Sequence, residues 1–300
     1  MWPNFLVVGA SKAGTTSVYE QLRQHPDIYM SPLKEPHYFS FPGGLPDFQG
    51  VNDDRFKGRV VTNEQQYRHL FDGASGESAV GECSVSYLYY PAAAENIRAK
   101  IPHCRIIILL RDPVDRALSQ YRQNVSNGRE PLSLSEAFLA EKKRLAQNWR
   151  WIVAYRGAGL YADQVSRYID AFGHDQVKVY LLEDLRSDAA GVMADMFAFL
   201  GVEPSFRPKL EVYNRSVLPN SSMANRLLRS KWAKWLGRLA PVALRHAVRD
   251  RLLAGNLADG PSNGLSQDER LRYHRYFAED IARLEQIIGR SLSAWKGSGP

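Results

Sequence analysis

The sequence predicts a three-layer, doubly wound α/β fold around a mostly parallel sheet. Short apolar runs alternate with segments of helical character along most of the 300 residues, which is typical of βαβ units. The run Arg105–Leu110 consists, after its first residue, of isoleucine and leucine alone, as expected for a strand buried on both faces of a parallel sheet. No internal repeat or strong linker divides the chain, so a single domain over residues 1–300 is expected.

The expected elements follow in order. Predicted strands are the run beginning at Phe5, then 28–30, 78–83, 105–110 and 177–182. Predicted helices are 15–24, 64–71, 91–100, 114–124, one opening at the capping residue Ser133, 159–171, 189–200 and 268–295. Residues 32–39 predict a turn into a short helix, because Pro36 suits the first helical position. Residues 41–62, rich in Gly, Pro and Asp, predict a long surface excursion of the kind that often borders a substrate.

The loop after the first strand predicts an anion site. A helix that starts there presents unpaired N–H groups and the positive end of its dipole. Gly9 and Gly14 have the spacing of the glycines in a Walker A loop, but Thr15 and Thr16 replace the Lys-Ser/Thr pair of that motif. The lysine is instead inside the loop, at Lys12. The pattern therefore favours a phosphate cradle that a lysine approaches from another side, and argues against an NTPase.

Composition and charge restrict the class of protein. The chain is 44% hydrophobic and 24% charged, as in an ordinary soluble protein, and its net charge of +7 favours anionic partners. Cys83 and Cys104 form neither a disulfide framework nor a metal-ligand cluster. There is no signal-peptide pattern and no apolar run near the roughly 18 residues needed to span a bilayer. These features predict a soluble, cytoplasmic protein; they say nothing of its oligomeric state.

Residues 222–254 are unusually basic. One interpretation is a pair of amphipathic helices, within a basic helical region 222–260, that pack on or beside the core with a solvated face. The other is a surface for an anionic acceptor or for peripheral contact with an anionic membrane. Only Asp250 opposes the cations of this region, which are Arg226, Arg229, Lys231, Lys234, Arg238, Arg245, Arg249 and Arg251.

Three stretches together carry a family resemblance. Residues 11–17 (Ser-Lys-Ala-Gly-Thr-Thr-Ser), 25–28 (His-Pro-Asp-Ile) and 34–39 (Lys-Glu-Pro-His-Tyr-Phe) resemble sulfotransferases that use 3′-phosphoadenosine 5′-phosphosulfate (PAPS), above all the Golgi heparan-sulfate enzymes and their bacterial relatives. The similarity runs from Phe5 to about Trp295. It implies PAPS as donor co-substrate and a hydroxyl-bearing small molecule, glycan or glycolipid as acceptor. It implies neither a metal nor a nucleic-acid partner.

The resemblance implies roles for the loop and for residues 34–37. Lys12 would hold the 5′-phosphate and neutralise charge as the S–O bond breaks. Glu35 would be the base that takes the acceptor's proton, with Lys34 contacting the sulfuryl group or acceptor. His37 is the competing base, since the cytosolic small-molecule enzymes use a histidine, and a purely structural role for these residues is the third interpretation. The remaining expected donor-binding residues of the loop are Ser11, Ala13, Gly14, Thr15, Thr16 and Ser17.

Four later positions extend the expected donor site. Arg111, at the carboxyl end of a buried strand, and Ser119 would hold the 3′-phosphate; alternatively, Arg111 and Asp112 form a structural pair that caps the next helix. Tyr161 would lie near the adenine ring, although a core tyrosine fits as well. Arg215 matches a basic loop over the 3′-phosphate, without the glycine that relatives have there.

One departure from the relatives leaves the acceptor open. Cys83 stands where the heparan-sulfate group has a lysine, so either Lys34 carries that charge alone or the acceptor is not a heparan-like polyanion. Two other functions compete with sulfuryl transfer. One is a kinase-like or NTP-hydrolysing P-loop enzyme, favoured by the spacing of Gly9 and Gly14 and by Asp112 after the strand. The other is a non-catalytic polyanion-binding protein built on the basic region.

Overall fold

The structure, a computed structural model, describes residues 1–209 and 265–295. Within them, five strands form one sheet in the order β2-β3-β1-β4-β5, and every pair of neighbours is parallel. This confirms the predicted parallel α/β architecture. The strands are β1 (Phe5–Gly9), β2 (Ile28–Met30), β3 (Ala79–Cys83), β4 (Arg105–Leu110) and β5 (Val177–Leu181).

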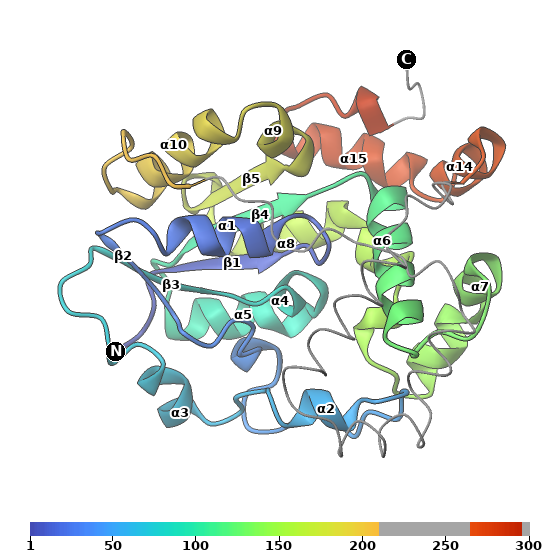
Figure 1. The fold of residues 1–300 in the computed structure, drawn as a ribbon, viewed down its shortest axis with the longest axis horizontal. Coiled ribbons are helices and arrows are strands. Elements are labelled where there is room, and N and C mark those ends of the chain that lie inside the picture. The colour runs from blue at the N-terminus through green and yellow to red at the C-terminus, as the bar shows by residue number, and fades with distance from the viewer. Residues whose placement is uncertain (210–264, 296–300) are drawn as a thin grey trace, which may run out of the picture.

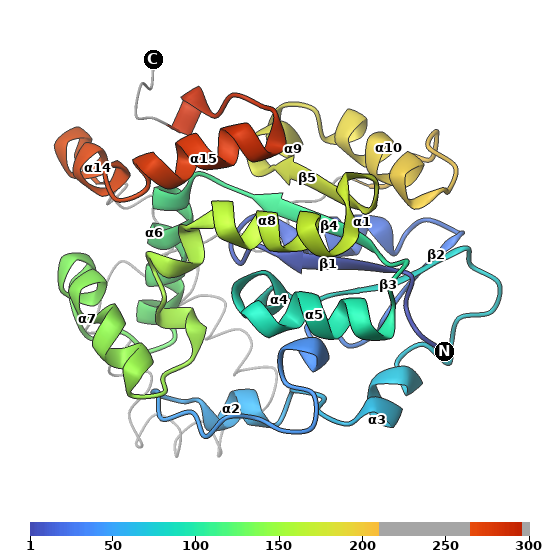
Figure 2. The same cartoon turned by 180° about the vertical axis from the view of Figure 1, so that it is seen from behind.

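Helices cover both faces of the sheet. Figure 1 shows α1 lying across one face, and Figure 2 shows α4, α5, α8 and α15 across the other, which gives the three expected layers. The helices are α1 (Thr15–Leu22), α2 (Asp54–Lys57), α3 (Glu64–His69), α4 (Ser86–Tyr89), α5 (Pro91–Lys100), α6 (Pro113–Ser126), α7 (Leu134–Ala146), α8 (Tyr161–Phe172), α9 (Leu182–Ser187), α10 (Ala189–Leu200), α14 (Gln267–His274) and α15 (Ala278–Ile288).

The strand order places a switch point beside β1. The chain leaves β1 for the edge strand β2, returns to β3 next to β1, and then crosses to β4 on the other side of β1. Phe5 of β1 pairs with Gly81 on one side and Arg105 on the other, so the carboxyl ends of these central strands lie at one edge. Gly81 is required there, because a Cβ would come within 2.4 Å of the Phe5 ring. Ligands of open α/β sheets bind at such a switch point.

The predicted turn into a short helix is confirmed in part, but the helix does not begin at Pro36. Residues 38–40 form a single 3₁₀ turn instead, and Glu35 and His37 before it have left-handed φ values of 63° and 59°. Long-range hydrogen bonds hold this conformation: the Glu35 N–H donates to the Cys83 carbonyl, and the His37 N–H donates to Ser84 Oγ, both at 3.0 Å. These bonds tie the segment to the end of β3.

Residues 41–62 form the predicted surface excursion, and a few buried side chains anchor it. They include the short helix α2 and a small cluster of aromatic side chains, Phe41, Phe48 and Phe56. Asp53 pairs with Arg150 at 2.5 Å, and both side chains are at most 5% exposed. The Arg150 guanidinium also lies 4.3 Å from the centre of the Phe56 ring. Local sequence could not show this, because the anchoring partner is about a hundred residues away.

The single helix predicted over 268–295 is also wrong. The chain forms α14, turns through Arg275–Phe277, forms α15 and ends in a 3₁₀ turn at Ser293–Trp295. The buried Asp280 of α15 accepts hydrogen bonds from the N–H groups of Tyr161 (2.6 Å) and Ala162 (3.2 Å), and so caps α8 from another helix. Other element ends agree with prediction to within a few residues. The basic region 222–260 lies outside the described residues.

Candidate active site

The loop between β1 and α1 is shaped as an anion site. The Ala10 N–H donates to the Leu109 carbonyl at 2.5 Å, which fastens the loop to β4. Gly14 precedes α1 with a φ of 88°, and a Cβ there would come within 2.8 Å of Leu182. Gly14 is the N-cap residue of α1, and it has no side chain that could cap the helix. A helix start of this kind directs N–H groups and the positive end of the helix dipole toward an anion at the switch point.

Cations gather around this loop. Arg111 Nη1 donates to the Lys12 carbonyl at 3.3 Å, while its buried Nε has no hydrogen-bond partner within the described residues. Burial lowers the pKa of Lys12 from its usual value, and the charge of Arg111 lowers it further. Burial also lowers the pKa of Arg111. A bound anion would relieve both effects, because it stabilises the protonated forms.

Lys34, Glu35 and His37 form a second polar group, electrostatically coupled to Lys12. Lys34 Nζ donates to Glu35 Oε1 at 2.8 Å, and His37 Nε2 lies 3.6 Å from Glu35 Oε2. Burial alone would raise the pKa of Glu35, but the charge and hydrogen bond of Lys34, together with the charge of Lys12, bring it below its usual value. Glu35 is therefore ionised at neutral pH, and its side chain is 34% exposed.

His37 is buried behind this carboxylate. Its side chain is only 5% exposed, and its Nδ1 is hydrogen-bonded to Ser86 Oγ at 2.7 Å. Its ring lies 5.0 Å from that of Phe56. Burial lowers the pKa of His37 to about 4, so the imidazole is neutral at neutral pH. Its contacts orient the ring toward Glu35.

Glu82 supports the segment from the sheet. It is fully buried, and its carboxyl group accepts hydrogen bonds from the Tyr67 hydroxyl at 3.2 Å and from Ser84 Oγ at 2.8 Å. Burial raises the pKa of Glu82 to about 7. Sequence reasoning did not assign Glu82, Ser84 or Ser86 to the site. The available signal was the alternation of polar residues directly at and after the end of a buried strand.

Cys83 lies in the core rather than on the surface of the site. Its side chain is fully buried, and its Sγ lies 3.9 Å from the Thr15 carbonyl oxygen at the start of α1. Burial raises the pKa of the Cys83 thiol to about 12, so it carries no charge. Cys83 therefore does not replace the positive charge of the lysine that the heparan-sulfate group has at this position. Lys34, which is paired with Glu35, is a cation beside the candidate base.

The remaining predicted residues are distributed as follows. Tyr161 is fully buried and donates its hydroxyl proton to the Arg111 carbonyl at 3.0 Å, which matches the core interpretation and leaves no exposed ring face for adenine. Ser119 is buried on α6. Asp112 caps α6 by accepting from the Asp115 N–H at 2.9 Å, whereas Arg111 lies 3.8 Å from the Asp115 carboxylate, so the cap of the structural alternative is present but the ion pair of Arg111 is with Asp115. Arg215 lies outside the described residues.

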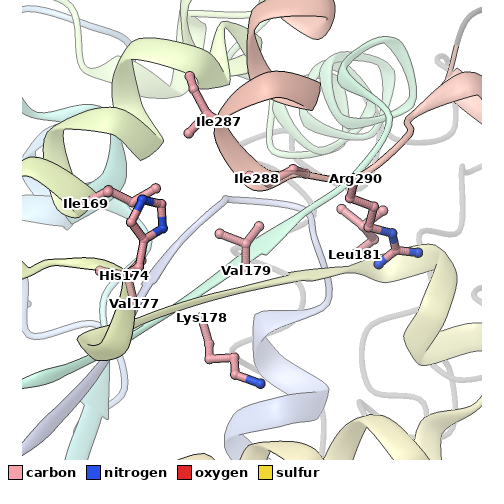
Figure 3. A pocket seen from close by; sticks show the side chains of 9 residues that line it. All are labelled: Ile169, His174, Val177, Lys178, Val179, Leu181, Ile287, Ile288 and Arg290. Carbon is pink, nitrogen blue, oxygen red and sulfur yellow. The ribbon is translucent and has the colours of Figure 1, made fainter.

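A cavity of about 210 Å³ lies elsewhere, between β5, α8 and α15 (Figure 3). Its lining is mainly aliphatic, and its cations Lys178 and Arg290 are paired with Asp195 and Asp184. None of its lining residues comes from the loop, from residues 34–37 or from Arg111.

Within the described chain, no group of three or more His, Cys, Asp or Glu side chains is placed to hold a metal ion. No described helix is both long and apolar enough to cross a membrane.

A parallel sheet with a phosphate-type loop and cations at its switch point is the arrangement expected of an α/β protein that binds an anionic, nucleotide-like ligand. The comparison with known proteins is more specific. The family model of the sulfotransferase domain matches residues 3–226. The chain therefore belongs to the sulfotransferase family.

Individual relatives agree with this assignment. The crystal structure of a sulfotransferase from Alicyclobacillus acidocaldarius is 38% identical, with a TM-score of 0.79 and 99% of both chains covered. Carbohydrate sulfotransferase 15 of Homo sapiens is 25% identical over 268 residues, which cover 73% of this chain and 47% of that protein. The bifunctional heparan sulfate N-deacetylase/N-sulfotransferase 4 of Mus musculus is 30% identical over 216 residues, or 68% of this chain and 23% of that protein. The chain thus spans about half, or less, of the length of these curated relatives.

Proposed function

We propose that this protein is a single-domain enzyme that transfers a sulfuryl group from PAPS to an acceptor hydroxyl. The observation that carries the proposal is the gathering of Lys12, Lys34 and Arg111 around an anion-binding loop, with the ionised Glu35 coupled to two of them. Sulfuryl transfer needs these parts: cations for the leaving phosphate and the sulfuryl oxygens, and a base for the acceptor. The family assignment supports the same reaction.

The donor fits the loop and Arg111. The N–H groups of the loop and of the first turn of α1, together with Lys12, would hold the 5′-phosphate. The Arg111 Nε, buried without a partner in the described chain, would donate to the 3′-phosphate beside Ser119. Tyr161 would act indirectly, since its hydroxyl group fixes the backbone from which Arg111 extends.

The reaction would be a direct in-line displacement. The acceptor oxygen attacks sulfur, while the bond from sulfur to the bridging oxygen of the 5′-phosphate breaks. Lys12 stabilises the charge that develops on the leaving phosphate, and Glu35 takes the acceptor's proton. The products are a sulfate ester and adenosine 3′,5′-bisphosphate. No covalent enzyme intermediate is formed, and the cations of the chain supply the charge that a metal supplies in kinases.

Glu35 is the better candidate for the base than His37. The Glu35 side chain is 34% exposed, whereas that of His37 is 5% exposed and has Nδ1 engaged by Ser86. The remaining ring nitrogen of His37 is directed to Glu35 rather than to open solvent. His37 would therefore position Glu35, and Lys34 would hold its other carboxylate oxygen.

The acceptor we propose is a carbohydrate or glycolipid hydroxyl. The names of the curated relatives support the carbohydrate part of this proposal, since they include a carbohydrate sulfotransferase and a heparan sulfate N-sulfotransferase. We also propose the cytoplasm as compartment, which agrees with Cys83 and Cys104 being free thiols.

Calorimetric binding tests the donor site. Adenosine 3′,5′-bisphosphate should bind without metal, and 5′-AMP and ATP with magnesium should bind much more weakly. Lys12→Ala and Arg111→Ala should both weaken bisphosphate binding, whereas Arg23→Ala, an exposed position at the far end of α1, should not. Equal binding of ATP with magnesium would instead favour the P-loop kinase or NTPase function. Binding that is indifferent to Arg111 would refute the 3′-phosphate site.

A further inference from the structure

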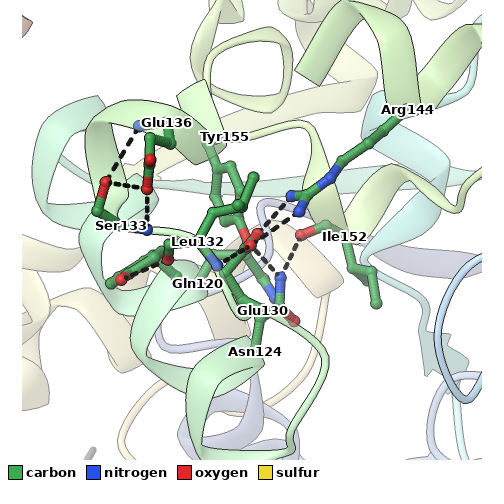
Figure 4. A network of polar contacts seen from close by, with 10 residues as sticks. Gln120, Asn124, Glu130, Leu132, Ser133, Glu136, Arg144, Ile152 and Tyr155 are labelled. Atoms are coloured by element: carbon green, nitrogen blue, oxygen red, sulfur yellow. Dashed lines mark hydrogen bonds and ion pairs between the residues drawn. The ribbon is translucent and has the colours of Figure 1, made fainter. Parts of the chain in front are cut away.

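A series of buried polar side chains connects the loop to the ion pair of Glu130 and Arg144, and Figure 4 shows its part from Gln120 to Arg144. Ser11 Oγ lies 3.0 Å from Gln120 Oε1, and Gln120 Nε2 lies 3.3 Å from Asn124 Oδ1. Asn124 Nδ2 reaches the Tyr155 hydroxyl at 2.9 Å, and that hydroxyl lies 2.8 Å from Glu130 Oε2. Gln120, Asn124 and Tyr155 are at most 3% exposed, so water does not compete for these groups.

The direction of each hydrogen bond is set at the far end of this chain. The Arg144 guanidinium donates two hydrogen bonds to Glu130, at 2.5 and 2.9 Å, so the carboxylate can only accept. Tyr155 must therefore donate its proton to Glu130. Burial raises the pKa of Tyr155, which keeps that proton in place. The Tyr155 oxygen is left to accept a hydrogen bond.

The side-chain amides of Asn124 and Gln120 determine which atom faces Ser11 in the loop. Asn124 Nδ2 donates to the Tyr155 oxygen and to the Ile152 carbonyl at 2.8 Å, and a flipped amide would place its oxygen against that carbonyl, acceptor against acceptor. Its Oδ1 therefore faces Gln120 and accepts from Nε2. Gln120 Oε1 is then the atom that faces the loop. Ser11 can meet that oxygen only by donating its hydroxyl proton.

We propose that Gln120 and Asn124 are positioning residues. They orient the Gln120 amide so that the Ser11 hydroxyl donates its proton to Gln120 Oε1 on α6. Ser11 then offers a bound phosphate its backbone N–H but no hydroxyl proton, and its side chain anchors the loop in the shape that binds the donor. This assigns Ser11 a different part from the one expected of a phosphate-binding serine. The inference rests on the proposed function for the identity of the ligand, but not for the hydrogen-bond chain itself.

A double-mutant cycle between Ser11 and Gln120 tests the inference. Ser11→Ala and Gln120→Met should each weaken adenosine 3′,5′-bisphosphate binding, by about two- to tenfold for Ser11→Ala, because both remove the Ser11–Gln120 hydrogen bond. Gln120→Met also removes the bond to Asn124, so its effect should be at least as large. The double variant should be no weaker than Gln120→Met alone. If Ser11→Ala costs far more affinity than Gln120→Met, or if the two effects multiply, the serine proton goes to the ligand and the proposal is overturned.

The same cycle measured by urea unfolding needs no ligand. Coupling between Ser11 and Gln120 in unfolding free energy is expected, and additivity there would overturn the hydrogen-bond chain. Asn124→Leu should abolish the coupling, because the Gln120 amide then loses its orientation; Gln123→Met, at an exposed position of α6, should preserve it. Coupling that persists in Asn124→Leu would refute the role of Asn124. If the unfolding cycle shows coupling but the wild-type protein does not bind the bisphosphate, the proposed function is refuted, whereas the series of hydrogen bonds is supported.

Discussion

Replacing Glu82 by glutamine removes a buried titrating group that accepts a hydrogen bond from Ser84, which in turn holds the backbone N–H of His37. Burial raises the pKa of Glu82 to about 7, from 4.5 in an unfolded chain, so the folded protein holds the proton more tightly. The resulting stabilisation is fully present below pH 4.5 and is lost as the pH rises through about 7. The difference between these values corresponds to about 3 kcal/mol of unfolding free energy.

Urea unfolding from about pH 4 to about pH 8 measures this contribution. The stability of wild type minus that of Glu82→Gln should fall by about 3 kcal/mol across the range, with most of the change between the two pKa values. Glu95→Gln, at an exposed position of α5, should give a difference that stays nearly constant. A constant difference for Glu82→Gln as well would mean that the carboxyl group titrates normally in the fold, and would refute its burial as the cause.

Substitutions of Glu35 and His37 test the acceptor side of the site, and a substitution of Asp53 tests the anchoring of residues 41–62. Glu35→Gln should lower kcat by roughly 10²- to 10⁴-fold, the usual worth of a general base, while bisphosphate binding is kept; His37→Asn should lower kcat less. An equal or larger loss with His37→Asn would reverse their roles. Asp53→Asn should lower the unfolding free energy by about 3–5 kcal/mol in denaturant titrations, because it leaves Arg150 as an uncompensated buried charge. The matched change Asp47→Asn, at an exposed ion pair, should cost no more than about 1 kcal/mol, and a similar loss at both sites would contradict the argument.

Elements with a strong local signal were predictable from sequence. Arg105–Leu110 and Pro91–Lys100 have the predicted bounds, since one is apolar enough for burial on both faces and the other starts at a proline. The loop after β1 was also recognisable, because its glycines and its place between strand and helix are local features.

Features set by distant contacts were not predictable. The left-handed backbone at Glu35 and His37 depends on bonds to Cys83 and Ser84, which lie more than forty residues away. The same holds for the orientation of Ser11, which depends on Gln120. The residues of the candidate site could thus be named from the sequence, whereas the groups that orient them could not. Their catalytic roles remain predictions.

The cap that α15 places on α8 sets a limit on how far the chain can be shortened. Asp280 binds the N–H groups at the start of α8, and the first residue of that helix, Tyr161, holds the carbonyl of Arg111. A truncation before residue 280 would remove this cap and release the start of α8. The proposed donor site, although Lys12 and Arg111 belong to the first 120 residues, would therefore need α15 to keep the backbone at Arg111 in place.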